Sequence, residues 1–175
     1  VAISIAIGVA TCVMYVMLND AVTTLVCAAV LTLIQLELYG ALYWLDMKLN
    51  PVSFINLVTT TGVSVEIVAH MARAYSVATE PDRTSRALRA FTTMAPALAN
   101  GAFTTFLGIS PVAFSNYAYF VKYFWLQWCV MLAVSLTHGI VLAPILLSLI
   151  GGETGVEKDA IATIDCDGVD THDHP

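Results

Sequence analysis

The residues most capable of chemistry lie in one strongly apolar stretch, NLVTTTGVSVEIVAHMARAYS, at residues 56–76. This stretch carries Glu66 and His70, followed by Arg73. On a helix, a spacing of four residues places the carboxyl group and the imidazole one turn apart, where they can hydrogen-bond or share a proton. A charged side chain in mid-membrane costs about 2.5–3.5 kcal/mol, and ionisable residues there usually serve function. The pair is a candidate proton relay, and a hydrogen bond that only holds helices together is the alternative.

The same stretch predicts a polar stripe along one helix face. At 100° per residue, Thr59 and Gly62 fall on the side that also carries Glu66, His70 and Arg73. Such a stripe is tolerated in a membrane span when it faces the interior of a bundle, where its groups are neutral, paired or hydrated. We therefore expect this face to be turned away from lipid.

Two further ionisable residues occur in apolar segments. His138 follows Ser135 and Thr137, and we include it as a third member of the candidate relay. A lone buried histidine is more often a hydrogen-bonded core residue, which is the competing interpretation. Glu37 gives a weaker signal, since it could lie in a lateral cavity, reach the membrane surface or pair with a polar group outside this chain.

Small residues follow one another at helical spacing between residues 90 and 114. Such a ridge lets a neighbouring helix approach closely, so the favoured interpretation is helix packing. The ridge consists of Ala97, Gly101 and Thr105, and the residues beside it are Asn100, Thr104 and Gly108.

Several kinds of site are absent from the sequence. There is no HExxH, GxSxG or Walker motif, and glutamate followed four residues later by histidine has the wrong order and spacing for a helical zinc protease. His70 and His138 are expected at different depths, which disfavours a haem between them. The four cysteines show no disulfide or zinc spacing. We expect no enzyme activity, no cofactor or metal, and no nucleic-acid partner.

The composition places the chain in a membrane. Of its 175 residues 58% are apolar and 11% are charged, and the mean hydropathy is +0.80, whereas an average soluble domain has about 25% charged residues. The chain opens on an apolar run, which we interpret as a fragment beginning inside a span. Residues 1–150 hold six basic and six acidic residues, whereas residues 151–175 hold one basic and seven acidic ones. We expect 151–175 to be an acidic, disordered cytoplasmic tail.

Five apolar segments are long enough to be transmembrane helices, since about 20 residues cross a bilayer. Four arginines lie in or beside the connection after the third segment, and the positive-inside rule therefore places this connection in the cytoplasm. The predicted fold class is all-α, a polytopic transmembrane helix bundle. The predicted spans are residues 1–18, 21–45, 52–76, 90–114 and 120–149, with a short amphipathic helix carrying the arginines before residue 90.

Three segments resemble the C-terminal transmembrane half of Niemann-Pick type C sterol transporters, relatives of Patched and Dispatched in the resistance-nodulation-division superfamily. The resemblance covers residues 1–150 and includes glycine-x-x-x-acid, here Gly62 to Glu66. His70 and the triplet at 137–139 favour the Niemann-Pick branch over Patched. The segments are LNPVSFINLVTTTGVSVEIVAHMARAYS, DRTSRALRAFTTMAPALANGAFTTFLGI and VMLAVSLTHGIVLAPILLSLIGG.

The resemblance implies a fragment of a transporter that moves cholesterol or a related lipid out of an acidic lumen, with Glu66 and His70 as one side of a proton relay. Implied partners are membrane lipids, sterol, the missing N-terminal half and lumenal domains, and a soluble lumenal sterol carrier. The implied location is a late endosome, lysosome or other endomembrane, or the plasma membrane. A Patched-like receptor, a lipid or drug exporter of the same superfamily, and a purely structural bundle are the alternatives.

Overall fold

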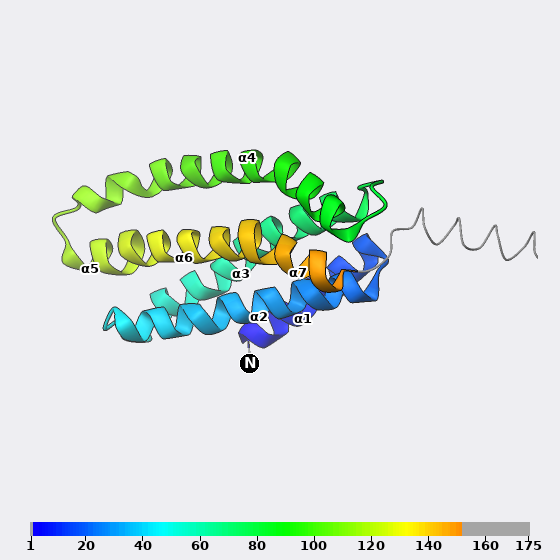
Figure 1. The fold of residues 1–175 in the computed structure, drawn as a ribbon. Helices are drawn as coiled ribbons and strands as arrows, with labels where there is room; N and C mark the ends of the chain where they lie inside the picture. Colours follow the sequence, from blue (N-terminus) through cyan, green and yellow to red (C-terminus); the bar gives the residue numbers. More distant parts are fainter. Residues whose placement is uncertain (1, 152–175) are drawn as a thin grey trace, which may run out of the picture.

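The computed structural model describes residues 2–151, and every regular element in this part of the chain is helical. The predicted fold class, an all-α polytopic bundle, is confirmed. Figure 1 shows long helices that run alternately in opposite directions along one axis. The elements are α1 (Ala2–Leu18), α2 (Ala21–Trp44), α3 (Pro51–Ser76), α4 (Arg83–Ile109), the 3₁₀ turn η1 (Ser110–Phe114), α5 (Ala118–Phe120), the π-helical η2 (Val121–Leu126), α6 (Gln127–Leu136), the π-helical η3 (Thr137–Leu142) and α7 (Ala143–Ile150).

Within residues 2–151, four helical runs are long and apolar enough to cross a membrane. A fifth run, Ile3–Leu18, is apolar but shorter. The acidic tail predicted at residues 151–175 lies outside the described residues, apart from Gly151. The four long runs are Ala21–Trp44, Pro51–Ser76, Arg83–Phe114 and Ala118–Ile150.

Local capping explains where α2 and α3 begin. The Asp20 carboxylate accepts hydrogen bonds from the backbone N–H groups of Val22 and Thr23, at 3.4 and 3.0 Å. Asn50 caps α3 in the same way, accepting from the Ser53 N–H at 2.8 Å, and Pro51 occupies the first helical turn. These side chains satisfy N–H groups that have no partner within the helix.

The fourth span begins earlier than its apolar pattern suggests. The arginines before residue 90 were expected on a separate short helix, but α4 is continuous from Arg83. Arg86 is buried, and its guanidinium carbon lies 5.2 Å from the centre of the Tyr75 ring at the end of α3. This contact packs the first turns of α4 onto α3, so the polar turns and the apolar span form one helix.

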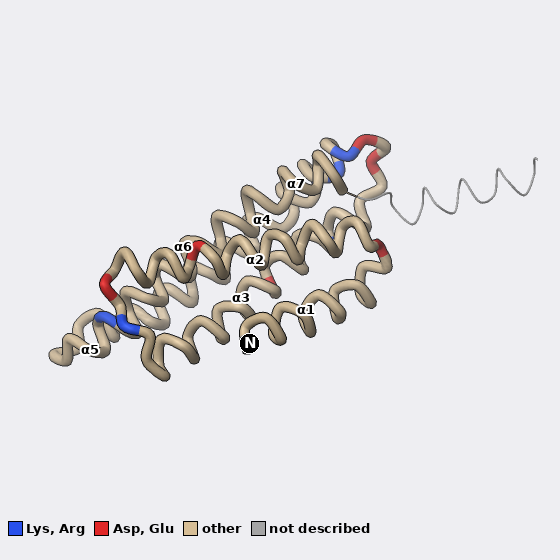
Figure 2. Tube along the Cα trace, turned by 90° about the horizontal axis from the view of Figure 1, so that it is seen from below, with Lys and Arg blue, Asp and Glu red and all other residues tan. Residues whose placement is uncertain are grey.

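The helix α3 occupies the centre of the bundle, where it packs against α1, α2, α4, α6 and α7. Its inner side contributes the fully buried residues Leu57, Val68 and Met71. Many large apolar side chains on the other helices point outward, as expected of a surface that faces lipid rather than water. Figure 2 shows most charged residues at the two ends of the bundle, with acidic residues also present along the helices between them.

Candidate functional site

The polar stripe on α3 lies on the open side of that helix. Thr59, Gly62, Glu66, His70 and Arg73 are all exposed in this chain, although α3 is central to the bundle. The stripe therefore shares one face, as the helical spacing predicts. Within the described residues, however, no helix packs on that face closely enough to bury these side chains.

Glu66 and His70 both line a cavity between α3 and α4. Its volume is about 460 Å³, and it also has Gly101 and Thr105 in its wall. The rest of the lining is apolar and comes from α3, α4 and α6: Val63, Ile67, Met94, Ala97, Leu98, Ala102 and Leu132. The cavity thus places one carboxyl group and one imidazole in surroundings that are otherwise suited to an apolar ligand or to a partner helix.

The direct contact expected between Glu66 and His70 is not present. Among the residues that the structure describes, neither a hydrogen bond nor an ion pair joins these two side chains. They share the cavity instead. Proton exchange between them would pass through water or a ligand inside it.

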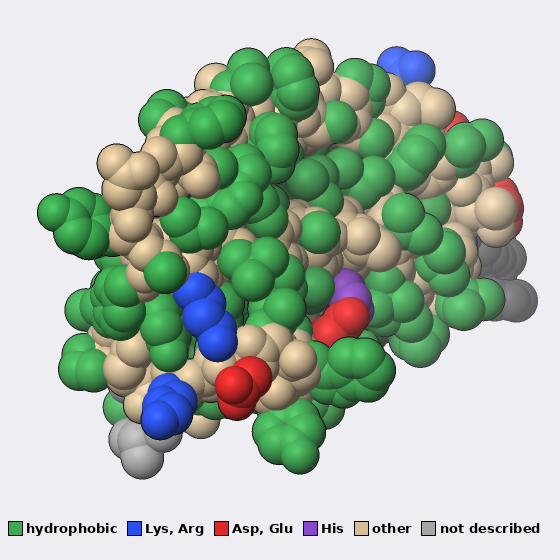
Figure 3. Space-filling model, turned by 90° about the vertical axis from the view of Figure 1, so that its left-hand side faces the viewer, with side chains coloured by type: hydrophobic (Ala, Val, Ile, Leu, Met, Phe, Trp, Pro, Cys, Tyr) green, Lys and Arg blue, Asp and Glu red, His purple; other side chains and the backbone are tan. Residues whose placement is uncertain are grey.

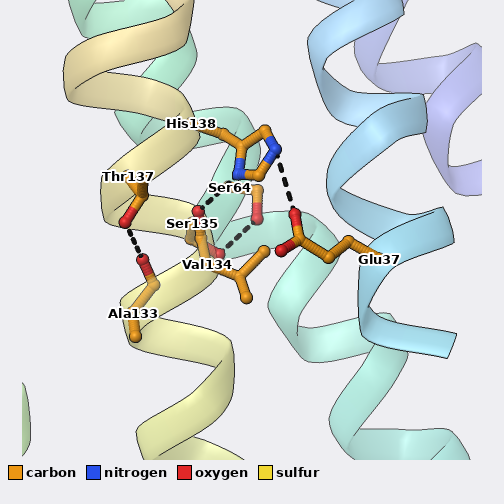
Figure 4. Close-up of polar contacts among 7 residues, drawn as sticks. All are labelled: Glu37, Ser64, Ala133, Val134, Ser135, Thr137 and His138. Atoms are coloured by element: carbon orange, nitrogen blue, oxygen red, sulfur yellow. Dashed lines mark hydrogen bonds and ion pairs between the residues drawn. The ribbon is translucent and has the colours of Figure 1, made fainter. Parts of the chain in front are cut away.

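His138 lies in a different place from the other two candidate relay residues. Its Nε2 is 3.1 Å from the Glu37 Oε2 on α2, and its Nδ1 is 3.0 Å from the Val134 carbonyl oxygen one turn earlier (Figure 4). The histidine side chain is 16% exposed and that of Glu37 is 53% exposed. In Figure 3 a histidine lies beside an acidic side chain within a largely hydrophobic face. Glu37, the weakest of the sequence candidates, therefore has its partner within this chain.

The glycines of the small-residue ridge do not pack against another described helix. A Cβ added at Gly101 or Gly108 would meet no heavy atom within 4 Å, and the same holds for Gly62 in the stripe on α3. The glycine that does allow a close approach is Gly139, where an added Cβ would overlap Ile67 Cγ2 and lie 3.3 Å from Ile67 Cβ. Within the described part of the chain, Gly101 and Gly108 therefore make no close helix contact, and the packing role of the α4 ridge stays a prediction.

A network of buried polar residues that sequence reasoning missed joins α3 to the last span. Asn56 donates to the Tyr123 carbonyl at 2.8 Å and to the Gln127 Oε1 at 3.2 Å, and Gln127 in turn donates to the Ser53 carbonyl at 3.2 Å. One signal was available in the sequence, because polar residues recur every three or four positions along α3. The members of this recurrence are Ser53, Asn56, Thr60 and Ser64.

A separate polar contact joins the same two helices closer to His138 in the sequence. Ser64 on α3 and Ser135 on α6 are joined through their hydroxyl oxygens at 2.8 Å (Figure 4). Ser135 lies one turn before His138, where the backbone changes from α to π geometry at Thr137. Single-turn π segments inside α-helices occur frequently at functional sites.

No family model matches the chain, but comparisons with known proteins identify relatives. Over 143 residues, 80% of this chain and 10% of the relative, it is 34% identical to Protein patched homolog 1 of Caenorhabditis elegans. It is 36% identical to Protein patched homolog 2 of Homo sapiens over 123 residues, 70% of this chain and 10% of that protein. It is 31% identical to NPC intracellular cholesterol transporter 1 of Sus scrofa over 129 residues, 73% of this chain and 10% of that protein. The chain spans about a tenth of the length of these relatives.

Proposed function

Because this chain belongs to the family of the Patched homologs and the NPC intracellular cholesterol transporters, we propose that it is the membrane-embedded part of a protein that moves sterol or a related lipid. The proposal assigns binding and transport, and no catalysis of a chemical reaction, to this segment.

The cavity that contains Glu66 and His70 is the structural observation that supports transport. The cavity between α3 and α4 combines an apolar wall with Glu66 and His70, and all of its lining residues belong to helical runs of membrane-spanning length. An apolar wall accommodates lipid or a moving helix, and ionisable groups at this depth are characteristic of proton pathways in transporters. We propose that proton binding at Glu66, assisted by His70, is coupled to lipid passage.

Direction and partners follow from the same proposal. Protons taken up from an acidic lumen would drive lipid out of that lumen, which favours a late endosome or lysosome over the plasma membrane. The remaining half of the same protein would cover the open face of α3 and α4, since transporters built from two repeats form their sites at the interface between them. A soluble lumenal sterol carrier would deliver the lipid.

The test uses the full-length protein in sealed liposomes that contain a fluorescent sterol. Sterol transfer is measured with and without a pH gradient for wild type, Glu66→Gln and Glu66→Asp. Glutamine keeps the size and hydrogen-bonding capacity of the side chain but cannot bind and release a proton. We expect Glu66→Gln to lose the response to the gradient and Glu66→Asp to keep part of it.

Asp46→Asn is the matched control, because it makes the same acid-to-amide change at an exposed position outside the cavity. It should transport like wild type, and all variants should elute and unfold like wild type. Normal gradient-dependent transport by Glu66→Gln would refute the proton-coupled mechanism and leave the stripe on α3 with a structural role.

The second candidate is a Patched-like membrane receptor, and the comparisons favour it as an alternative. The identity to the Patched homologs, 34% and 36%, is no lower than the 31% identity to the cholesterol transporter. A receptor would bind sterol in the same assay without transferring it between membranes. An exporter of lipids or drugs would instead transfer several unrelated apolar probes.

A further inference from the structure

Both ring nitrogens of His138 face an oxygen atom. The Val134 oxygen next to Nδ1 belongs to a backbone carbonyl, which only accepts hydrogen bonds. The 3.0 Å contact therefore requires that Nδ1 carries a proton and donates it. The bond made by one ring nitrogen fixes what the other can do.

With the proton on Nδ1, a neutral imidazole presents a lone pair at Nε2. That nitrogen lies 3.1 Å from the Glu37 Oε2, which in an ionised carboxylate also presents only lone pairs. Two acceptors at this distance repel each other. A favourable contact at this distance requires one additional proton between them, carried either by the histidine as an imidazolium or by Glu37 as a carboxylic acid.

Other ionisable side chains lie on or beside the helices that pack around this pair. They are Cys12 and Tyr15 on α1, Asp20, Cys27, Tyr39 and Tyr43 on or beside α2, Glu66, His70 and Arg73 on α3, Arg83, Arg86 and Arg89 on α4, and Cys129 on α6. Within the described part of the chain, none of them forms a hydrogen bond or ion pair with Glu37 or His138.

Neither Glu37 nor His138 is among the residues that line the cavity of Glu66 and His70. Gly139, the residue after His138, packs against Ile67, the residue after Glu66. Ile67 forms part of the cavity wall, whereas the His138 side chain points toward Glu37 on α2 (Figure 4). At the contact of Gly139 with Ile67, an added methyl group would already overlap the Ile67 side chain.

We propose that Glu37 and His138 form a proton-binding site of their own, in which one bound proton joins α2 to the π-helical segment η3. Loss of that proton leaves two outcomes. Either Nδ1 keeps its bond to Val134 and Glu37 is repelled from Nε2, or the ring changes tautomer, donates to Glu37 and gives up the bond to Val134. Each outcome breaks one contact, so proton binding is linked to the packing of α2 against η3. This inference does not depend on lipid transport.

The test measures the protonation of His138 directly. Full-length protein labelled with ¹⁵N at its histidine rings is placed in lipid bilayers, and nitrogen NMR spectra are recorded between about pH 5 and 8, the range in which histidine charge changes. The signals of His138 are identified by their absence from the spectra of the His138→Gln variant. In wild type we expect Nδ1 to carry a proton at the acidic end, with Nε2 either protonated or accepting a hydrogen bond. The proposal would be overturned if, in wild type, the His138 ring stayed neutral with its proton on Nε2 at every pH measured.

Glu37→Gln is the informative variant, because the amide N–H can donate to Nε2 without any titrating proton. His138 should then stay neutral, with its proton on Nδ1, across the whole range. An unchanged response of His138 to pH in Glu37→Gln would contradict the shared site. Glu66→Gln tests whether the Glu37–His138 site is independent of Glu66. In this variant, His138 should respond to pH as in wild type. Loss of the His138 response in that control would show one connected network and refute an independent site.

Discussion

Two buried glutamines in the membrane-spanning helices have opposite surroundings. Gln127 is 2% exposed, accepts a hydrogen bond from Asn56 and donates one to the Ser53 carbonyl. Gln35 on α2 is 4% exposed, and neither its Nε2 nor its Oε1 has a hydrogen-bond partner in the described part of the chain. An unpaired buried amide is destabilising, whereas a paired one contributes to the association of helices.

This difference predicts opposite effects of one substitution. Gln127→Leu removes two hydrogen bonds between α3 and α6 and leaves the Asn56 amide with the Tyr123 carbonyl alone, so the free energy of unfolding should fall by about 1–2 kcal/mol. Gln35→Leu replaces an unpaired amide with an apolar group of similar size and should be neutral or stabilising. Equilibrium unfolding of the full-length variants in bilayers measures both. A loss of stability in Gln35→Leu as large as that in Gln127→Leu would show that Gln35 has a partner.

At the level of helices, the contact between η3 and α3 depends on a single small residue. Gly139 is buried against Ile67, while the glycines on α4 face open space within the described residues. The consequence is that α3 approaches η3 closely at this point, whereas the part of α3 that carries Glu66 and His70 is separated from α4. A cavity of about 460 Å³ occupies that gap.

Gly139→Ala should therefore be costly. Its methyl group would overlap the Ile67 side chain next to Glu66, and overpacking of this kind costs about 1–3 kcal/mol. Gly40→Ala on α2 is the matched control, since an added Cβ there meets nothing within 4 Å. Thermal unfolding of both full-length variants checks the expectation. Equal stability of the two would mean that η3 and α3 are not held this closely.

The sequence predicted those features that depend on local patterns. The helical fold class follows from apolar runs of spanning length, and α3, Pro51–Ser76, differs by one residue from the predicted span 52–76. The stripe containing Glu66 and His70 follows from helical spacing. By contrast, the pairing of Glu37 with His138 depends on how α2 and η3 align, and the early start of α4 depends on where Arg86 meets Tyr75. Contacts between distant segments leave no periodic signal in a single sequence.

For the whole molecule, the distribution of charge gives the orientation in the membrane. One end of the bundle carries Arg73 and the arginines at the start of α4, and the opposite end carries Lys48 and Lys122. Lys122 donates to the Asp46 carbonyl at 2.8 Å, so it is fixed at the turn between α2 and α3. Since connections rich in arginine and lysine remain in the cytoplasm, the end where α3 meets α4 is expected to be cytoplasmic.

Single cysteines test this orientation. Thr84 and Asn116 are both exposed, and they lie at opposite ends of α4 and its following turn. In full-length protein whose native cysteines have been replaced, Thr84→Cys should react with a membrane-impermeant maleimide only from the cytoplasmic side. Asn116→Cys should react only from the other side, because α4 crosses the bilayer between them. Permeabilised membranes provide the control for reactivity, since both cysteines must then be labelled. The reverse pattern would contradict the orientation, and labelling of both cysteines from one side would contradict α4 as a membrane span.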